Sequence, residues 1–137
     1  MTTLLRVSEA ASLAIHTMFL LSLNQDKLIS TKEIAQTLLV SENHLAKVLQ
    51  RLVKNGYIQS IRGPKGGFKL NLSDDSITML DIYESIDGSI LDCNCLLDVQ
   101  ICGGNCLLEG FISEVNDKFR KTLASKKLSD LSNKFKK

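Results

Sequence analysis

Residues 30–72 read STKEIAQTLLVSENHLAKVLQRLVKNGYIQSIRGPKGGFKLNL and carry the start and stop signals of two helices and a hairpin. Ser30 precedes a glutamate by three residues, and this pairing satisfies free backbone N–H groups at a helix start. Ser41 opens a longer helix, whose apolar residues recur at three- and four-residue steps until Asn55-Gly56 ends it. The sequence therefore predicts two consecutive helices joined by a tight turn.

Two runs of strand-forming residues follow, at positions 57–61 and 68–72, and the loop RGPKGG (residues 62–67) connects them. In the second run, apolar residues alternate with Lys69 and Asn71, which is typical of a half-buried strand. Helix, turn, helix and a hairpin with a basic tip together predict a winged helix-turn-helix. In that fold the second helix enters the major groove of DNA, and the hairpin lies along the backbone or minor groove.

The distribution of charge favours contact with nucleic acid. Residues 41–70 contain six Lys or Arg and one acid, whereas the whole chain has a net charge of only +2. Neutralising phosphates requires such a local concentration of cations and not a high global charge. The alternative is a small helical domain whose lysines are merely solvated, and the one-sided charge weighs against it.

Length and composition limit the possible classes of protein. A chain of 137 residues, 44% hydrophobic and 23% charged, is expected to form one domain, or one domain with an appended element. No apolar run reaches the roughly 18 residues that span a bilayer, and no signal peptide is recognisable. We therefore expect a cytoplasmic protein without membrane contact, in a reducing compartment where cysteines suggest metal or redox chemistry more than disulfides.

Helices are also predicted on both sides of this unit. Residues 8–23 form an apolar helix that is buried against other elements or against a second subunit. His16 lies within it, and position alone favours a hydrogen-bonded core histidine over a metal ligand. Thr78, with Asp81 three residues later, starts a short helix that ends at Asp87-Gly88.

The segment after the hairpin has a different character. Residues 73–114 hold nine acids and no Lys or Arg, so this segment does not lie on DNA. It contains all four cysteines: Cys93, Cys95, Cys102 and Cys106. Soft thiolates on a glycine-containing loop suit an iron–sulfur cluster or zinc, although the spacing matches neither a ferredoxin run nor a zinc ribbon. A redox-active thiol pair and unligated cysteines are the alternatives.

The last part of the chain predicts an assembly element. Residues 107–123 form a long helix with one apolar stripe, which beyond a complete small domain indicates packing against a partner helix. Residues 128–131 predict a short final turn or helix before a basic tail. The predicted fold is thus mainly α with a small β-hairpin wing: a winged helix-turn-helix in residues 1–88, a cysteine loop in 89–106, and a dimerisation helix with its tail in 107–137.

These residues resemble the IscR/NsrR-type iron–sulfur winged-helix transcription regulators. The resemblance runs from residue 6 to residue 131, and its most specific parts are LAKVLQRL (45–52), KNG (54–56), RGPKGGF (62–68) and the late cysteines before a long helix. It implies a homodimer whose long C-terminal helices cross and support two winged helices. It also implies that loss, oxidation or nitrosylation of a cluster changes DNA affinity.

The resemblance implies a ligand set as well. In cluster-bearing members, three loop cysteines and a fourth, non-cysteine ligand hold one cluster per subunit, which fits either a two-iron (2Fe-2S) or a four-iron (4Fe-4S) type here. Cys106 and Cys102 match the last and middle cysteines, and the first is Cys95 or Cys93. An all-cysteine site is a further alternative. The candidates for the fourth ligand are His16, Ser12 and Glu109, of which serine is the poorest donor.

For DNA, the early and exposed positions of the second helix predict base contacts by Asn43, Ala46 and Lys47. Some members of the family carry a glutamate where Ala46 stands, so we expect a different operator to be read. Arg51 and His44 are predicted to contact the DNA backbone or to pack. The predicted wing contacts are Arg62, Gly63, Pro64, Lys65 and Gly66.

The leading hypothesis is therefore a dimeric transcription regulator whose affinity for a palindromic operator is set by an iron–sulfur cluster. The alternative is a cluster-free regulator of the same fold that senses through thiols, zinc or a partner protein. A cluster carrier would leave the basic wing without a purpose. An enzyme is not expected, because no nucleophile–base constellation, phosphate loop or catalytic carboxylate pair is recognisable.

Overall fold

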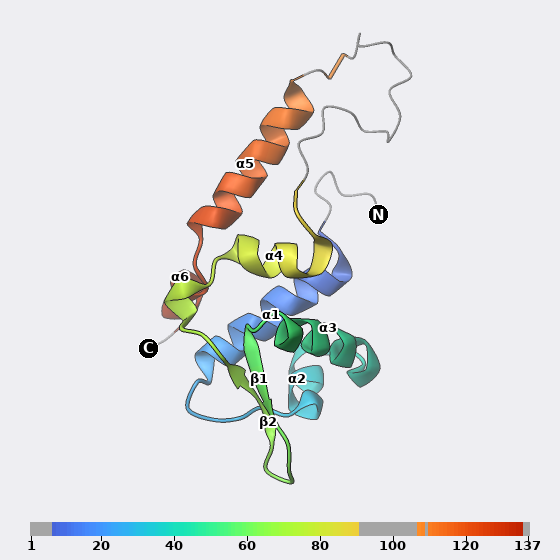
Figure 1. Cartoon of the computed structure of the whole chain (residues 1–137), viewed down its shortest axis with the longest axis vertical. Helices are drawn as coiled ribbons and strands as arrows, with labels where there is room; N and C mark the ends of the chain where they lie inside the picture. The colour runs from blue at the N-terminus through green and yellow to red at the C-terminus, as the bar shows by residue number, and fades with distance from the viewer. Residues whose placement is uncertain (1–6, 91–106, 109, 136–137) are drawn as a thin grey trace.

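The computed structural model describes residues 7–90, 107–108 and 110–135. Its elements in chain order are α1 (Glu9–Leu23), α2 (Thr31–Leu38), α3 (Glu42–Lys54), β1 (Ile58–Ile61), β2 (Gly67–Leu70), the 3₁₀ turn η1 (Asp74–Ser76), α4 (Met79–Asp87), α5 (Phe111–Ser125) and α6 (Leu128–Asn133). The β1–β2 hairpin projects from one end of a helical body, and α5 extends beyond the other end (Figure 1). The predicted fold class, mainly helical with a small antiparallel hairpin, is confirmed.

Serine side chains cap the first three helices, at Ser30 and Ser41 as the sequence predicts and also at Ser8. The hydroxyl oxygens of Ser8, Ser30 and Ser41 each accept the backbone N–H three residues on, at 3.0, 3.2 and 3.2 Å. These bonds satisfy donors that have no partner within the helix. At the far end of α3, Gly56 adopts a φ of 80°, a left-handed conformation that glycine reaches without steric cost.

One apolar core joins α1 to α2, α3, the hairpin and α4, and α6 closes it. The large apolar side chains that are fully buried are Met18, Leu21, Ile34, Leu45, Leu49, Leu52, Ile58, Ile77, Ile82 and Leu128. The core residues of α3 recur at three- and four-residue steps, so its opposite face is left for polar side chains. The core thus fixes which side of α3 faces outward.

The hairpin is anchored to the start of the helical body. Strands β1 and β2 pair antiparallel, with Ile58 opposite Leu70. Phe68 also exchanges two backbone hydrogen bonds with Ile29, at 2.8 and 3.1 Å, just before α2 begins. A Cβ on Gly67 would lie 2.7 Å from the Ile29 carbonyl oxygen, so this close approach requires glycine. The hairpin is therefore held in place relative to α2 and α3.

After the hairpin, the chain turns into α4 through the predicted capping box. The Asp81 N–H donates to Thr78 Oγ1 at 3.1 Å, and the Thr78 N–H donates to Asp81 Oδ2 at 2.9 Å. Much later in the sequence, α6 returns to this point: the Leu128 N–H donates to the Ile77 carbonyl at 2.8 Å. Because Leu128 is fully buried, α6 is part of the core.

Helix α5 differs from its prediction. It begins at Phe111 and not at residue 107, because Gly110 takes a φ of 81° that breaks the helical path, while Leu107 stays exposed. No residue of α5 is buried. One side leans on α4, where the rings of Tyr83 and Phe119 meet edge to face with centroids 5.5 Å apart. None of the helices in the described ranges has the length and apolar character needed to cross a membrane.

Candidate nucleic-acid interface

The predicted base-reading residues lie together on the outward side of α3. Asn43 and Lys47 are exposed and Ala46 is half-buried, all within the first half of the helix. The cap at Ser41 and the buried residues on the opposite side fix the direction of this surface. The arrangement presents one amide, one methyl group and one ammonium group to whatever approaches the start of α3.

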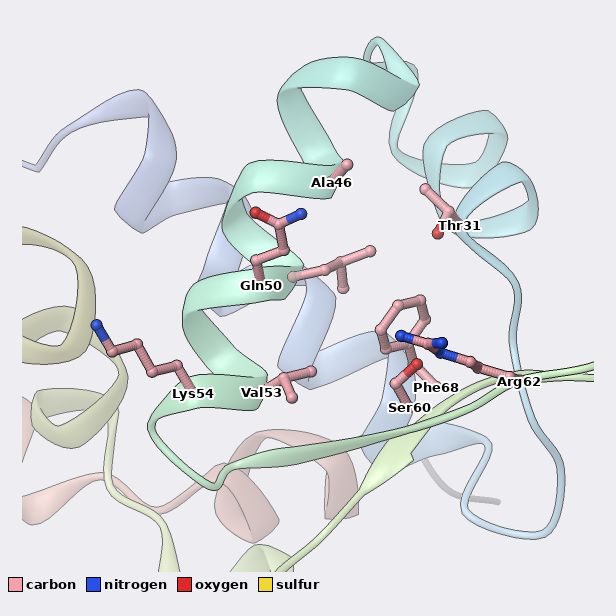
Figure 2. Close-up of a pocket in the computed structure, with 9 residues that line it drawn as sticks. Thr31, Ala46, Gln50, Val53, Lys54, Ser60, Arg62 and Phe68 are labelled. Carbon is pink, nitrogen blue, oxygen red and sulfur yellow. The ribbon is translucent and has the colours of Figure 1, made fainter.

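A groove of about 430 Å³ runs between α3 and the hairpin. It is lined by Thr31, Ala46, Leu49, Gln50, Val53, Lys54, Ser60, Arg62 and Phe68. Figure 2 shows the Arg62 side chain reaching from the hairpin toward the Phe68 ring, with Gln50 and Ala46 on α3 at the other side of the groove. The groove therefore has an apolar floor and a rim of amide, hydroxyl and guanidinium groups.

The tip of the hairpin is a tight turn. The Gly66 N–H donates to the Gly63 carbonyl at 2.9 Å, with Pro64 and Lys65 exposed between them. Gly63 has a φ of 126°, and a Cβ on Gly66 would lie 2.1 Å from the Ile61 carbonyl oxygen. Both positions thus require glycine, and the turn holds the Lys65 ammonium at the outermost point of the wing.

Exposed cations on this side of the molecule have no acidic partner within the described part of the chain. Lys47, Lys54, Arg62 and Lys65 are exposed, and none makes an ion pair with another described residue. Their charges are therefore available to an anionic partner. A polyanion that follows the groove from α3 to the wing tip would meet them in succession.

Arg51, which the sequence predicts to contact the DNA backbone or to pack, is placed differently from the other cations. It does not line the groove, and its guanidinium donates to the Ile86 carbonyl of α4 at 3.1 Å. His44, the other residue with this prediction, has a buried Nε2 without a hydrogen-bond partner among the described residues. Contact of Arg51 with DNA stays a prediction.

His16 lies on the outer side of α1 and not in the core. Its ring is exposed, and Nδ1 lies 2.7 Å from the Ser12 carbonyl oxygen one turn earlier. Because a carbonyl only accepts hydrogen bonds, the hydrogen of the neutral ring sits on Nδ1 and leaves the Nε2 lone pair free. This is the tautomer in which a histidine can bind a metal through Nε2.

The predicted cysteine ligands and Glu109 fall outside the described residues, whereas Ser12 lies in α1 one turn before His16. The arrangement of Cys93, Cys95, Cys102, Cys106 and Glu109 therefore stays a prediction. Among the residues that are described, no three His, Cys, Asp or Glu side chains gather as a metal site would require.

Sequence reasoning missed several residues of the groove. Gln50 and Lys54 follow Ala46 at four-residue steps, so helical periodicity alone gave a signal for them. Thr31, Ser60 and Phe68 gave none, because they reach the groove only through the packing of α2 and the hairpin beside α3.

Comparison with protein families identifies one match along nearly the whole chain. The model of the Rrf2 family, described as an iron-dependent transcriptional regulator, matches residues 7–134. This range includes α3, the hairpin, the cysteine segment and α5.

Individual relatives agree in length and architecture. The chain is 32% identical over 123 residues to a candidate HTH-type transcriptional regulator of Aquifex aeolicus, covering 84% of this chain and 85% of the relative. It is 32% identical over 107 residues to the HTH-type transcriptional regulator NsrR of Bacillus licheniformis, covering 72% and 74%. The solved structure of CymR, the global cysteine regulator of B. subtilis, superposes with a TM-score of 0.80 at 28% identity, covering 95% of this chain and 98% of CymR.

Proposed function

The chain belongs to the Rrf2 family of transcriptional regulators, and from this premise we propose that it binds a palindromic operator as a homodimer whose DNA affinity is set by an iron–sulfur cluster. Helix α3 enters the major groove in this proposal, and the wing follows the adjacent backbone or minor groove. The observation that carries it is the groove between α3 and the hairpin, with Arg62 on its rim and unpaired cations on both sides.

The residues divide into those that read bases and those that hold the backbone. Asn43 and Lys47 carry the hydrogen-bonding groups that reach base edges, and the Ala46 methyl suits an apolar contact such as a thymine methyl. Arg62 and Lys65 extend along the wing and neutralise phosphates or enter the minor groove. Gly63, Pro64 and Gly66 act through the shape of the turn that positions Lys65.

The uncovered stripe of α5 supports the homodimer. Phe111 is 51% exposed, and Ile112, Val115 and Leu123 are only partly covered within the chain. An apolar side that its own chain does not bury is typical of a subunit interface. A twofold axis through paired α5 helices would present two copies of α3 to the two halves of a palindrome.

The donor set fits an iron–sulfur cluster. All four cysteines occur between residues 93 and 106, and the exposed His16 has a free Nε2 lone pair. Cys95, Cys102 and Cys106 would hold the cluster with His16 as the fourth ligand, and Cys93 and Glu109 are the alternatives. When bound, the cluster would make DNA affinity responsive to oxidants, nitric oxide or iron supply. We place this sensing in the cytoplasm.

A second candidate follows from the likeness to CymR, the global cysteine regulator of B. subtilis. In this second candidate the DNA-binding residues are the same, but the regulator has no cluster. It senses through free thiols, zinc or a partner protein. The two candidates differ in one measurable property, the iron and sulfide content of the protein.

The DNA half is tested with duplexes selected from a random-sequence library by the wild-type protein. We expect Lys47→Ala and Arg62→Ala each to weaken binding about 10-fold or more and to lower the salt dependence of log K by about one unit. Lys121→Ala is the matched control, because that ammonium pairs with Asp117 on α5 at 2.9 Å. Unchanged affinity in both groove variants would remove α3 and the wing from the interface.

The cluster half is tested by anaerobic purification followed by absorption spectroscopy and by iron and sulfide analysis per chain. We expect near-equal iron and sulfide in the wild type and loss of both in Cys102→Ala. We expect the His16→Ala variant still to bind the cluster through its cysteines but to lose it faster than the wild type in air. A colourless, iron-free protein even after reconstitution would favour the thiol, zinc or partner version.

A further inference from the structure

The C-terminal end of α4 is tied to three other helices within five residues. The Ile86 carbonyl accepts the hydrogen bond from Arg51 of α3 at 3.1 Å. The Asp87 carboxylate accepts the backbone N–H of Ser8 at 3.0 Å and also the Ser8 hydroxyl, at the start of α1. The Ile90 carbonyl accepts a hydrogen bond from Arg120 of α5. We call residues 86–90 the α4 junction.

The bond from Arg51 gives a donor to one of the last carbonyls of α4. The last four carbonyls of a helix lack partners within it, and the negative end of the helix dipole lies there. Glu84 gives its carbonyl to the Gly88 N–H at 3.0 Å, while α4 has no basic residue in its own last turn. Arg51 therefore supplies from α3 both the missing donor and the missing cation for the Ile86 carbonyl.

Asp87 supplies an acceptor and a negative charge to the start of α1. Its carboxylate stands at the helix start, where unpaired N–H groups favour an anion. The Ser8 hydroxyl serves both sides, because it donates to Asp87 and accepts from Ala11. A displacement of the junction therefore acts on the first turn of α1 and on the last turn of α3 together.

We propose that Arg51 is a positioning residue that couples the α4 junction to the DNA-reading end of α3, and not a phosphate contact. Arg51 lies eight residues after Asn43, a separation of about 12 Å along a helix. A tilt of about 5° at the junction end would move the reading end of this segment by about 1 Å. Shifts of that size alter hydrogen bonds to base edges.

The inference rests on DNA reading by α3 as proposed above, but it does not depend on a cluster. In sequence, the junction leads directly into the segment that carries the cysteines. It is thus the first described attachment between that segment and α3, whichever chemistry the cysteines perform.

The first test is a double-mutant cycle on affinity for the selected duplex. We expect Asp87→Ala and Arg51→Ala each to weaken binding several-fold, and the double variant to be no weaker than either alone, because both break one linkage. Asp75→Ala is the control for loss of one negative charge, since this exposed carboxylate lies in η1 and accepts from Ser73. Additive losses in the double variant would overturn the proposal.

The second test separates positioning from phosphate contact. We expect Arg51→Ala to leave the slope of log K against log salt unchanged, whereas a lost phosphate contact lowers it by about one unit. Arg51→Gln keeps a donor for the Ile86 carbonyl without the charge, so it should bind more tightly than Arg51→Ala at the wild-type slope. A reduced slope in both variants would assign Arg51 to the phosphates instead.

A third measurement needs no DNA. We expect Asp87→Ala to speed amide hydrogen exchange in the last two turns of α3, and to have no such effect when Arg51 is already alanine. Exchange that rises equally in both backgrounds would overturn the coupling. Wild-type protein without specific duplex binding would instead count against the proposed function, so the two failures are distinguishable.

Discussion

Helices α3 and α5 are both amphipathic, yet they differ in what covers their apolar sides. In α3 the apolar residues Leu45, Val48, Leu49 and Leu52 are all buried by the same chain, whereas α5 has no buried residue. The helix with the proposed DNA-reading residues is thus fixed by packing within its own chain. The apolar stripe of α5 stays partly exposed among the described residues. The difference separates the residues that stabilise the fold from those that we propose for assembly.

The largest expected effect comes from a substitution in the buried apolar side of α3. Leu52→Ala removes a side chain with 0% exposure, so we expect the free energy of unfolding to fall by about 2–5 kcal/mol in urea denaturation. Val115→Ala in the half-covered stripe of α5 is the matched variant, and it should cost the isolated subunit less than about 1 kcal/mol. Equal losses at the two sites would show that α5 is as well packed as α3.

The next variant changes the exposed apolar stripe of α5. Phe111→Asp places a charge in the stripe that we propose to be the dimer interface, so we expect the dimer dissociation constant to rise by about 30-fold or more in sedimentation equilibrium. The free energy of unfolding of the monomer should change little, since Phe111 is 51% exposed. Lys118→Ala, on an exposed position of the same helix, is the control. A dimer of unchanged strength would place the interface elsewhere.

A smaller effect on stability is expected at Leu39, in the turn between α2 and α3. Leu39, between α2 and α3, has a φ of 57° and is 91% exposed, so it carries the strain of a left-handed residue without the benefit of burial. Leu39→Asn should therefore raise the stability by about 0.5–1 kcal/mol, seen as a Tm higher by about 2–6 °C. The adjacent Leu38→Asn should lower Tm because Leu38 packs against the core. A lower Tm for Leu39→Asn would reveal a packing role for its side chain.

The smallest effect concerns Tyr57, the residue before β1, and the charges of α4 that act on it. Burial, and then the charges of Asp81 and Glu84, raise the pKa of Tyr57 above its ordinary value of 10.0. The unfolded chain therefore loses the phenol proton first, and the stability present below pH 10 falls as the pH rises through the folded pKa. Tyr57→Phe should make this fall shallower, by less than about 1 kcal/mol after solvent screening, in urea denaturation at pH 8 and pH 10.5. Identical pH profiles would contradict the raised pKa.

Local signals explain how much of the fold could be predicted. The serine caps, the Thr78–Asp81 capping box and the apolar spacing of α3 act over three or four residues, and each element they predict is present. The start of α5 was placed too early, because the apolar pattern runs on through Leu107 while the positive φ of Gly110 interrupts the backbone. The apolar periodicity depends on side chains, so it does not reveal a break in the backbone at Gly110.

The candidate site divides in the same way. Asn43, Lys47 and the wing were predicted from helix position, charge and glycine content. The groove and the bond from Arg51 to Ile86 were not, because they arise from the packing of α2, the hairpin and α4 against α3, which no local pattern records. The burial of α6 against α1 was missed for the same reason: only the three-dimensional path of the chain brings the two together.

The return of α6 to the core has a consequence for synthesis on the ribosome. Helix α1 is made before α2 to α5, but one part of its cover, around the fully buried Leu128, emerges only after all of them. Closing so long a loop must wait until α6 is made, so that part of α1 is exposed to solvent and chaperones until then. A nascent chain that stops before α6 should therefore be an unstable target for proteolysis and not a smaller competitor for the operator. Only a chain that includes α6 can present α3 on a complete core.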